Sequence, residues 1–210
     1  MIRSEEDLRY YLEADRLALA CPMLRPFTRR WLADLLFPEE LWRFEILLRH
    51  VEYYSNREPS SALRPRTVLL NRIFHNASVK LGFSIPGNVF GPGLSIAHRG
   101  TIVVNSAARV GSNCRVHVCV NIGTDAGYSD MAPRIGDNVY IGPGAKIFGN
   151  ITIANGCAVG ANAVVNKSFL EPGSVIAGVP ARKVGETDTG SILTKATEIL
   201  KTRGWNRPED

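Results

Sequence analysis

The chain has 210 residues, four cysteines and a formal net charge of +5 at pH 7. This length is enough to bury a core, and a mild basic excess without charge runs argues against a nucleic-acid-binding protein. No apolar run approaches the roughly 20 residues that a membrane span needs. The charged start is not typical of a signal peptide. We therefore expect a cytoplasmic protein without a transmembrane segment.

The density of charge changes near Gly82. Residues 1–80 carry 24 charged side chains, whereas residues 81–185 carry 12. In the first part, apolar residues at three- and four-residue steps and intervening prolines predict helices. We expect these helices at 4–20, 27–37, 39–56 and 67–81, with Ser4 as the N-cap of the first. We interpret them as a small bundle or a docking arm.

An aliphatic residue recurs at every sixth position in the second part. The series is Val104, Val110, Val116, Ile122, and then Ile135, Ile141, Ile147, Ile153, Val159 and Val165. Six steps along a helix turn about 240° and would scatter these side chains over several faces, whereas six extended residues return to the same side. The series therefore predicts short strands around one interior. Cys114 and Cys157 fall on inward positions and are expected to be reduced core residues.

This pattern resembles the hexapeptide repeat of the left-handed parallel β-helix, in which each triangular coil has three strands and about 18 residues. The expected fold class is α+β. We predict an N-terminal α-helical domain at 1–82, a left-handed β-helix at 83–185, and a C-terminal tail at 186–210 with a weak helix at 192–202.

Two histidines interrupt the repeat. Stepping back six residues from Val104 reaches His98, where an aliphatic belongs, and His117 follows Val116 where glycine is usual. The separation of the two histidines is one coil of three hexads plus one position, so the coils should stack them at one corner. An imidazole suits a general base because its ordinary pKa lies near neutral pH.

A second interruption lies between two strands of the repeat. The interval from Ile122 to Ile135 is one position longer than two hexads. We therefore expect residues 124–133 to leave the coils as a protruding loop.

The segments 91–111, 132–153 and 177–185 resemble the serine acetyltransferase family. The resemblance implies acetyl transfer from acetyl-CoA to a hydroxyl, in trimers with active sites between subunits. It implies that His98 is the catalytic base. The acceptor hydroxyl would give its proton to His98 as its oxygen attacks the thioester carbonyl, and backbone N–H groups would stabilise the oxyanion.

The same resemblance implies a groove for the pantetheine arm of CoA, lined by small residues of the later coils. The residues expected to bind CoA are Gly142, Pro143, Gly144, Gly160 and Ala161, with Arg182 and Lys183 near the phosphates.

The chain departs from the family at the acceptor site. Ala132 replaces a second histidine, Ala97 and Phe83 replace two aspartates, and Met131 replaces an arginine. These losses argue against L-serine as the acceptor unless Arg99, Asp125 or Asp130 supplies the missing charges. The pattern resembles more closely the members associated with surface-polysaccharide synthesis, which implies an uncharged sugar hydroxyl as acceptor. His117 would then serve in place of the missing histidine.

Two other functions remain open, and a third is discounted. The first is serine O-acetylation for cysteine biosynthesis. The second is a non-catalytic role in assembly. The third, metal-dependent hydration, needs three histidine ligands, and only His98 and His117 lie in the repeat, so we expect no metal. The expected partners are CoA, a small acceptor and two further copies of the chain, with pairing of trimers through the N-terminal helices as an option.

Overall fold

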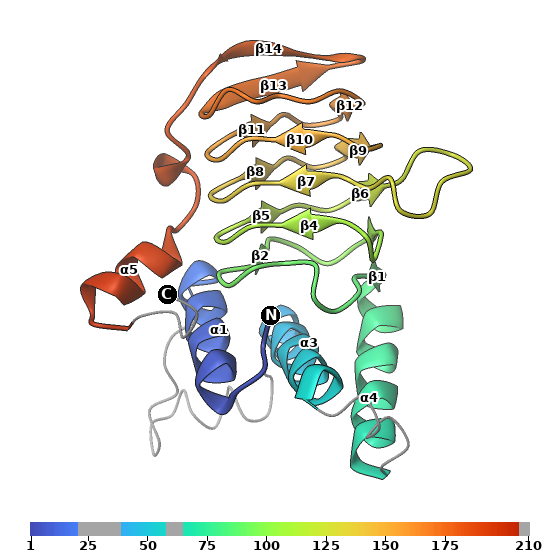
Figure 1. The fold of residues 1–210 in the computed structure, drawn as a ribbon, viewed down its shortest axis with the longest axis vertical. Coiled ribbons are helices and arrows are strands. Elements are labelled where there is room, and N and C mark those ends of the chain that lie inside the picture. The colour runs from blue at the N-terminus through green and yellow to red at the C-terminus, as the bar shows by residue number, and fades with distance from the viewer. Residues whose placement is uncertain (21–38, 58–64, 206–210) are drawn as a thin grey trace.

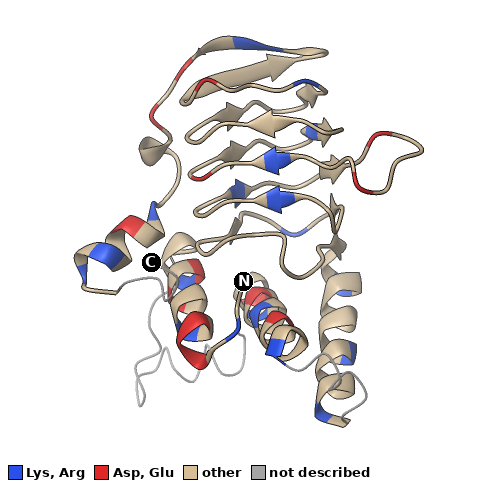
Figure 2. Cartoon of the chain, viewed as in Figure 1, with Lys and Arg blue, Asp and Glu red and all other residues tan. Residues whose placement is uncertain are grey.

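A computed structural model describes residues 1–20, 39–57 and 65–205 of the chain. Helices come first and stand beneath a stack of coils made of short strands (Figure 1). Figure 2 shows that the charged residues lie mainly on the helices and that the coils carry few, as the charge count predicts. Within the described ranges, no helix is both long and apolar enough to cross a membrane.

The first part of the chain forms three described helices. They are α1 (Glu5–Ala18), α3 (Glu40–Arg57) and α4 (Pro65–Leu81). The Ser4 hydroxyl accepts the Asp7 N–H at 2.9 Å, and the Asp7 carboxylate accepts the Ser4 N–H at 2.8 Å, which confirms Ser4 as the N-cap. The helices predicted at 4–20, 39–56 and 67–81 are confirmed within a few residues. The helix predicted at 27–37 lies outside the described residues.

The second part of the chain winds through three sheets, which we call A, B and C. Sheet A contains β1 (Phe83–Ser84), β3 (Ile102–Val104), β6 (Val120–Gly123), β9 (Lys146–Phe148) and β12 (Val164–Val165). Sheet B contains β4 (Arg109–Val110), β7 (Arg134–Ile135) and β10 (Thr152–Ile153). Sheet C contains β2 (Ser95–Ile96), β5 (Arg115–Val116), β8 (Tyr140–Ile141), β11 (Ala158–Val159), β13 (Ser174–Gly178) and β14 (Ala181–Glu186). Neighbouring strands are parallel, except that β13 and β14 form an antiparallel pair.

These coils form the left-handed parallel β-helix that the repeat predicts. Ile135 pairs with Ile153, and Ile141 pairs with Val159, so that each step between these coils is three hexads. The aliphatics of the series point inward and are almost fully buried. Each such side chain contributes about 1.5–3 kcal/mol by leaving water. Cys114 and Cys157 are buried free thiols, as predicted from their inward positions.

One hydrophobic cluster runs from helix α3 into the coils. Leu41, Phe44 and Leu48 on α3 belong to the same buried cluster as the inward aliphatics of the strands. The Phe44 ring also meets the Phe83 ring of β1 edge to face, with 4.9 Å between centroids. The helices therefore cover the open end of the β-helix.

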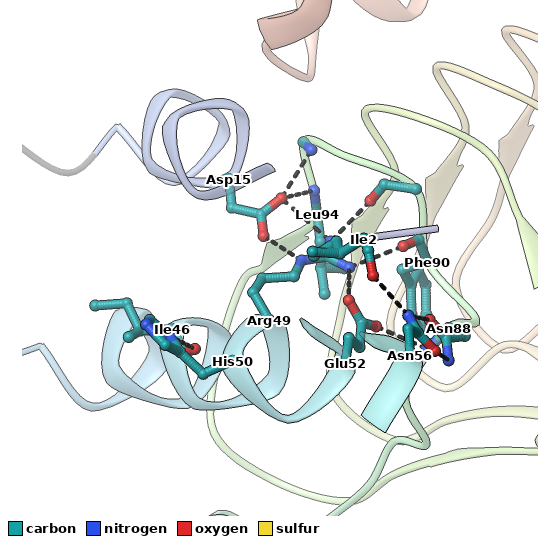
Figure 3. A network of polar contacts seen from close by, with 12 residues as sticks. Ile2, Asp15, Ile46, Arg49, His50, Glu52, Asn56, Asn88, Phe90 and Leu94 are labelled. Atoms are coloured by element: carbon teal, nitrogen blue, oxygen red, sulfur yellow. Dashed lines mark hydrogen bonds and ion pairs between the residues drawn. The ribbon is translucent and has the colours of Figure 1, made fainter. Parts of the chain in front are cut away.

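A buried arginine joins the helices to the first coil (Figure 3). The Arg49 guanidinium of α3 donates to Asp15 of α1 at 2.7 Å and to Glu52 at 3.0 Å. It also donates to the backbone carbonyls of Phe90 and Gly91 at 2.9 and 2.8 Å. Burial would lower the pKa of Arg49, but the carboxylates of Asp15 and Glu52 raise it above its ordinary value.

Three carboxylates of the helices accept hydrogen bonds from backbone N–H groups of the first coil. Asp15 accepts from Gly93 and Leu94, Glu52 from Asn88, and Glu45 from Ile96. Side chains thus satisfy the groups that a preceding coil would otherwise satisfy. Burial, together with the nearby charge of Asp15, raises the pKa of Glu45 well above its usual range.

The C-terminal segment returns along the coils to the helices. After β14, a 3-10 helix (Thr189–Ser191) leads to helix α5 (Ala196–Thr202), which packs against α1 (Figure 1). Thr197 of α5 and Asn113 of the coils exchange hydrogen bonds of 2.7 and 3.1 Å. The helix predicted at 192–202 therefore starts later than expected. The division into domains at 82 and 185 stays a prediction.

Candidate active site

Both histidines of the repeat lie at the corner that leads from sheet C to sheet A. His98 follows β2, and His117 follows β5 on the next coil. Their ring centroids are 5.8 Å apart, with 62° between the ring planes. The prediction that the two histidines stack on neighbouring coils is confirmed. The structure thus brings two imidazoles together at one corner of the β-helix.

The sequence predicted that His98 takes the place of an inward aliphatic in the repeat, and this prediction is wrong. The inward aliphatic of this coil is Ile96, which is fully buried and pairs with Val116, while the His98 side chain is exposed. Ile96 and Val104 are eight residues apart, whereas their partners on the next coil, Val116 and Ile122, are six apart. The first corner therefore contains two additional residues. Backward counting by six did not account for this insertion, and the insertion places His98 outside the core.

His117 is more enclosed than His98. Its ring lies 5.1 Å from the Tyr140 ring, and its Nε2 atom is buried without a hydrogen-bond partner among the described residues. Burial lowers the pKa of His117, and its electrostatic interactions with Arg115 and His98 lower it further. A neutral imidazole with an unused nitrogen can accept or donate one hydrogen bond to a molecule bound at this corner.

Two glutamates of α3 bind the chain on either side of His98. Arg99 donates to Glu40 of α3 at 3.0 Å, and Lys80 of α4 donates to the other oxygen of the same carboxylate at 2.6 Å. The hydrogen bond and charge of Lys80, with those of Arg99, lower the pKa of Glu40. On the other side of His98, the Ile96 N–H donates to Glu45. Arg99 thus points to α3 in this structure, and its predicted role in binding the acceptor stays a prediction.

The small residues predicted to line a CoA groove continue the same corner. Gly142 follows β8, and Gly160 follows β11, each on its own coil. The Gly144 N–H donates to the Val118 carbonyl at 2.9 Å, which places this turn directly beside the turn that contains His117. A Cβ on Gly142 would lie 2.8 Å from the Val159 carbonyl oxygen, so the coils approach too closely here for a side chain. Pro143 is partly exposed and Ala161 is exposed on this edge.

The far end of this corner carries Arg182 and Lys183. Arg182 on β14 pairs with Ala177 on β13. Ala177 directly follows Ile176, the last residue of β13 that pairs in parallel with β11. The Arg182 guanidinium is exposed and donates only to the Ala181 carbonyl, at 3.3 Å, among the described residues. Lys183 donates to Glu171 at 2.5 Å and to Glu186 at 2.9 Å. Arg182 is thus the cation at this end that has no carboxylate partner within the described chain.

The loop between β6 and β7 protrudes as predicted (Figure 1). Asp125 lies beside Gly149 of the next coil, while Asp130 is exposed and its carbonyl accepts the Ala132 N–H. The loop leaves from the corner between sheets A and B, whereas the histidines lie at the corner between sheets C and A. A single chain therefore does not bring these aspartates to the histidines.

The sequence prediction missed two residues of the site, Arg115 and Tyr140. Both point outward on sheet C, where Arg115 pairs with Tyr140 on the next coil. Arg115 was predictable, because it precedes His117 by two residues, with the inward Val116 between them, and therefore lies on the same outer side of the chain. The position of Tyr140 next to His117 is harder to predict, because the protruding loop separates the two residues along the chain. Among the residues that the structure describes, no three His, Cys, Asp or Glu side chains form a group suited to a metal ion.

Comparisons with known proteins agree with the repeat and the fold. Residues 132–167 match the family model described as bacterial transferase hexapeptide (six repeats). The chain is 36% identical over 121 residues to serine acetyltransferase of Escherichia coli, covering 56% of this chain and 44% of that protein. It also resembles the solved structure of serine acetyltransferase from Brucella abortus in complex with coenzyme A, with a TM-score of 0.64 and 26% identity over 87% of this chain and 70% of that one.

A third similar protein is soybean serine acetyltransferase complexed with serine. It has a TM-score of 0.65 and 26% identity over 86% of this chain and 70% of that one. The chain spans less than half of the length of the curated relatives that it matches first.

Proposed function

We propose that this chain, a hexapeptide-repeat β-helix protein similar to the serine acetyltransferases, is an acetyl-CoA-dependent O-acetyltransferase. The observation that carries the proposal is the corner between sheets C and A. It places His98 beside His117, with 5.8 Å between ring centroids, and continues as the edge of small residues toward Arg182. The corner thus joins a general base to a long surface suited to a thioester substrate.

His98 is the proposed general base. Its exposed side chain can reach an acceptor hydroxyl, and its imidazole nitrogen takes the hydroxyl proton as the oxygen bonds to the thioester carbonyl carbon. The carbon–sulfur bond then breaks, and the CoA thiolate leaves with the electron pair. The thiolate is a good leaving group because thiols are acidic compared with alcohols. We assign His117 a hydrogen bond to the acceptor or to the intermediate, through its unused Nε2.

The edge of small residues is the proposed pantetheine site. Four steps of sheet C separate β2 from β13, which makes about 19 Å at the usual spacing between strands. This length is comparable to that of an extended pantetheine arm. Gly142, Gly144 and Gly160 add no side chain to this edge, and Arg182 lies at the far end, where it can pair with a phosphate. Lys183 would first have to leave Glu171 and Glu186.

Two acceptors remain in competition. The relatives are named serine acetyltransferases, which favours L-serine. The sequence itself lacks charged groups at Ala97, Met131 and Ala132, which favours a sugar hydroxyl. The comparisons support L-serine better than a polysaccharide precursor, so L-serine is the first acceptor to test.

A trimer is part of the proposal. In a single chain the loop with Asp125 and Asp130 stands at a different corner from His98. A neighbouring subunit could bring such a loop to the histidines, which would complete a site between subunits. Pairing of trimers through the helices and a cytoplasmic location stay predictions.

The test is thiol release from acetyl-CoA with L-serine and with a panel of sugars. His98→Ala should lower kcat/KM about 10²- to 10⁴-fold, the usual contribution of a general base. His75→Ala is the matched control, because His75 is an exposed histidine on α4, and it should leave the rate unchanged. Equal rates for His98→Ala and wild type would refute the assignment of the base. A wild-type protein that neither binds CoA nor releases thiol would support a non-catalytic role in assembly.

A further inference from the structure

Arg115, which forms no ion pair among the described residues, lies on the outer face of sheet C, on the same coil as His117. Arg115 is the first residue of β5, and His117 directly follows that strand, two positions after Arg115; the residue between them, Val116, points inward, so Arg115 and His117 lie on the outer side. Ser95 and Tyr140 flank Arg115 on the neighbouring coils, in register with it. The outer face next to the proposed base therefore carries a guanidinium, a phenol and an imidazole.

The Arg115 side chain leans toward the coil of His98. Its Nη1 donates to the Ser95 hydroxyl at 3.2 Å, and Ser95 lies three residues before His98 on β2. Ser95 is almost fully buried and Arg115 is partly buried. The guanidinium is thus held over the strand that leads into the proposed base.

Arg115 differs from Arg49 and Arg99 in its lack of a carboxylate partner among the described residues, a feature that it shares with Arg182. Arg49 pairs with Asp15 and Glu52, and Arg99 pairs with Glu40. Within residues 1–20, 39–57 and 65–205, no carboxylate forms an ion pair with Arg115. A partly buried guanidinium that has only a hydroxyl partner retains unused N–H donors, which favour an anion.

The charge of Arg115 also acts on the imidazole of His117. It is one of the causes, after burial, that lower the pKa of His117. An anion bound to Arg115 would therefore lie within the electrostatic reach of the same imidazole. Geometry and charge both place an anion-binding group next to the site of the acceptor hydroxyl.

We propose that Arg115 binds a carboxylate of the acceptor while a hydroxyl of the same molecule lies at His98. The acceptor class is a hydroxylated carboxylic acid, and either a hydroxy amino acid such as L-serine or a sugar acid has this chemistry. The planar guanidinium fork matches a carboxylate with two parallel hydrogen bonds. This inference rests on the proposed acetyl transfer, and it replaces the uncharged sugar expected from the sequence.

The experiment compares charged and neutral acceptors. Acetyl transfer from acetyl-CoA is measured with L-serine and D-glucuronate, and with their uncharged counterparts L-serinamide (neutral at the carboxyl end) and D-glucose. Arg115→Gln should lower kcat/KM for the favoured carboxylate acceptor about 10- to 100-fold, mainly through KM, and leave the KM for acetyl-CoA unchanged. The two carboxylates distinguish an amino-acid acceptor from a sugar acid.

The control is Arg109→Gln. Arg109 is an outward arginine on β4 of sheet B, one strand before β5, and it donates to the backbone carbonyls of Ser106 and Ala108. This variant should behave as wild type toward every acceptor. Equal losses for Arg115→Gln on carboxylates and on their neutral counterparts would mean that Arg115 serves the fold alone. A wild-type preference for neutral acceptors would also overturn the proposal.

Calorimetry separates this inference from the proposed function. Binding of L-serine and D-glucuronate to the protein with CoA present needs no turnover. If no acceptor is acetylated but one of these carboxylates binds to wild type and to Arg109→Gln, and not to Arg115→Gln, acetyl transfer is wrong and anion binding is right. If neither carboxylate binds to wild type and neither is acetylated, the carboxylate site does not exist.

Discussion

The first coil and the later coils of the β-helix are built differently. In the later coils β7, β8 and β9 each pair with the strand three hexads onward, and backbone groups of one coil satisfy those of the next. In the first coil the step from Ile96 to Val116 is two residues longer, and its outer N–H and carbonyl groups are satisfied by side chains of α1 and α3. The later coils repeat one solution, whereas the first coil depends on individual side chains.

This difference indicates where the β-helix can present reactive side chains outside its core. A regular coil places an aliphatic inside and a small residue at each corner, so it offers little besides a smooth surface. The insertion in the first coil moves His98 out of the core, and the helices hold the residues on both sides of it. The proposed base thus lies where the repeat is broken and where charged side chains replace a neighbouring coil.

The largest stability effect should follow loss of Arg49, which has no counterpart in the later coils. Arg49→Ala leaves the carboxylates of Asp15 and Glu52 buried without their guanidinium, and such a change costs about 3–5 kcal/mol. Chemical denaturation measures the free energy of unfolding. Arg43→Ala, an exposed arginine on the same helix, should change it by less than about 0.5 kcal/mol. Similar values for the two variants would show that the first coil does not need the buried network.

A smaller effect is expected from Gly142→Ala in the later coils. The added Cβ would lie 2.8 Å from the Val159 carbonyl oxygen and 2.9 Å from the Ala161 nitrogen, which are backbone atoms that cannot turn aside. Overpacking of this kind costs about 1–3 kcal/mol. Gly185→Ala is the control, because a Cβ there meets nothing within 4 Å. A variant as stable as this control would mean that the coils can spread apart at the corner.

The pH dependence of stability should depend on Glu45. The folded pKa of this carboxyl is raised by burial, so the folded chain keeps a proton that the unfolded chain loses above about pH 4.3. Its contribution to stability is therefore present below that pH and is lost as pH rises through the folded pKa, by up to about 1.4 kcal/mol per pH unit. Glu45→Gln should be less sensitive to pH than wild type over this window. Glu198→Gln, at an exposed carboxylate, should keep the wild-type profile.

The smallest effect should come from Glu40→Gln, which weakens the ion pairs with Lys80 and Arg99 at the protein surface. The melting temperature should fall slightly at low salt, and the difference from wild type should disappear at about 1 M salt, because exposed charges are screened. Turnover should change only modestly, since the Ile96 side of the His98 turn is still held by Glu45. A large loss of activity at unchanged KM would instead give Glu40 a strong role in positioning the base.

The sequence alone determined the β-helix, because the six-residue period is a local property of the chain. The inward aliphatics and the protruding loop follow from counting residues along regular coils. The predicted proximity of His98 to His117 holds even though the coil between them contains two additional residues. The six-residue period does not hold in the first coil, where two additional residues follow Ile96. A regular period carries no information about where it will be interrupted, so His98 was predicted at a repeat position where an aliphatic belongs, although Ile96 occupies the inward position and the His98 side chain is exposed.

Only the tertiary structure decided which charged residues meet. Arg49 binds Asp15 and the Phe90 carbonyl, groups that are 34 and 41 residues away along the chain, and no pattern in the sequence connects them. The position of Arg115 between Ser95 and Tyr140 depends in the same way on the lengths of two unequal coils. Such contacts arise from packing between distant segments and not from periodicity, so the fold was readable from the sequence while the environment of the candidate site was not.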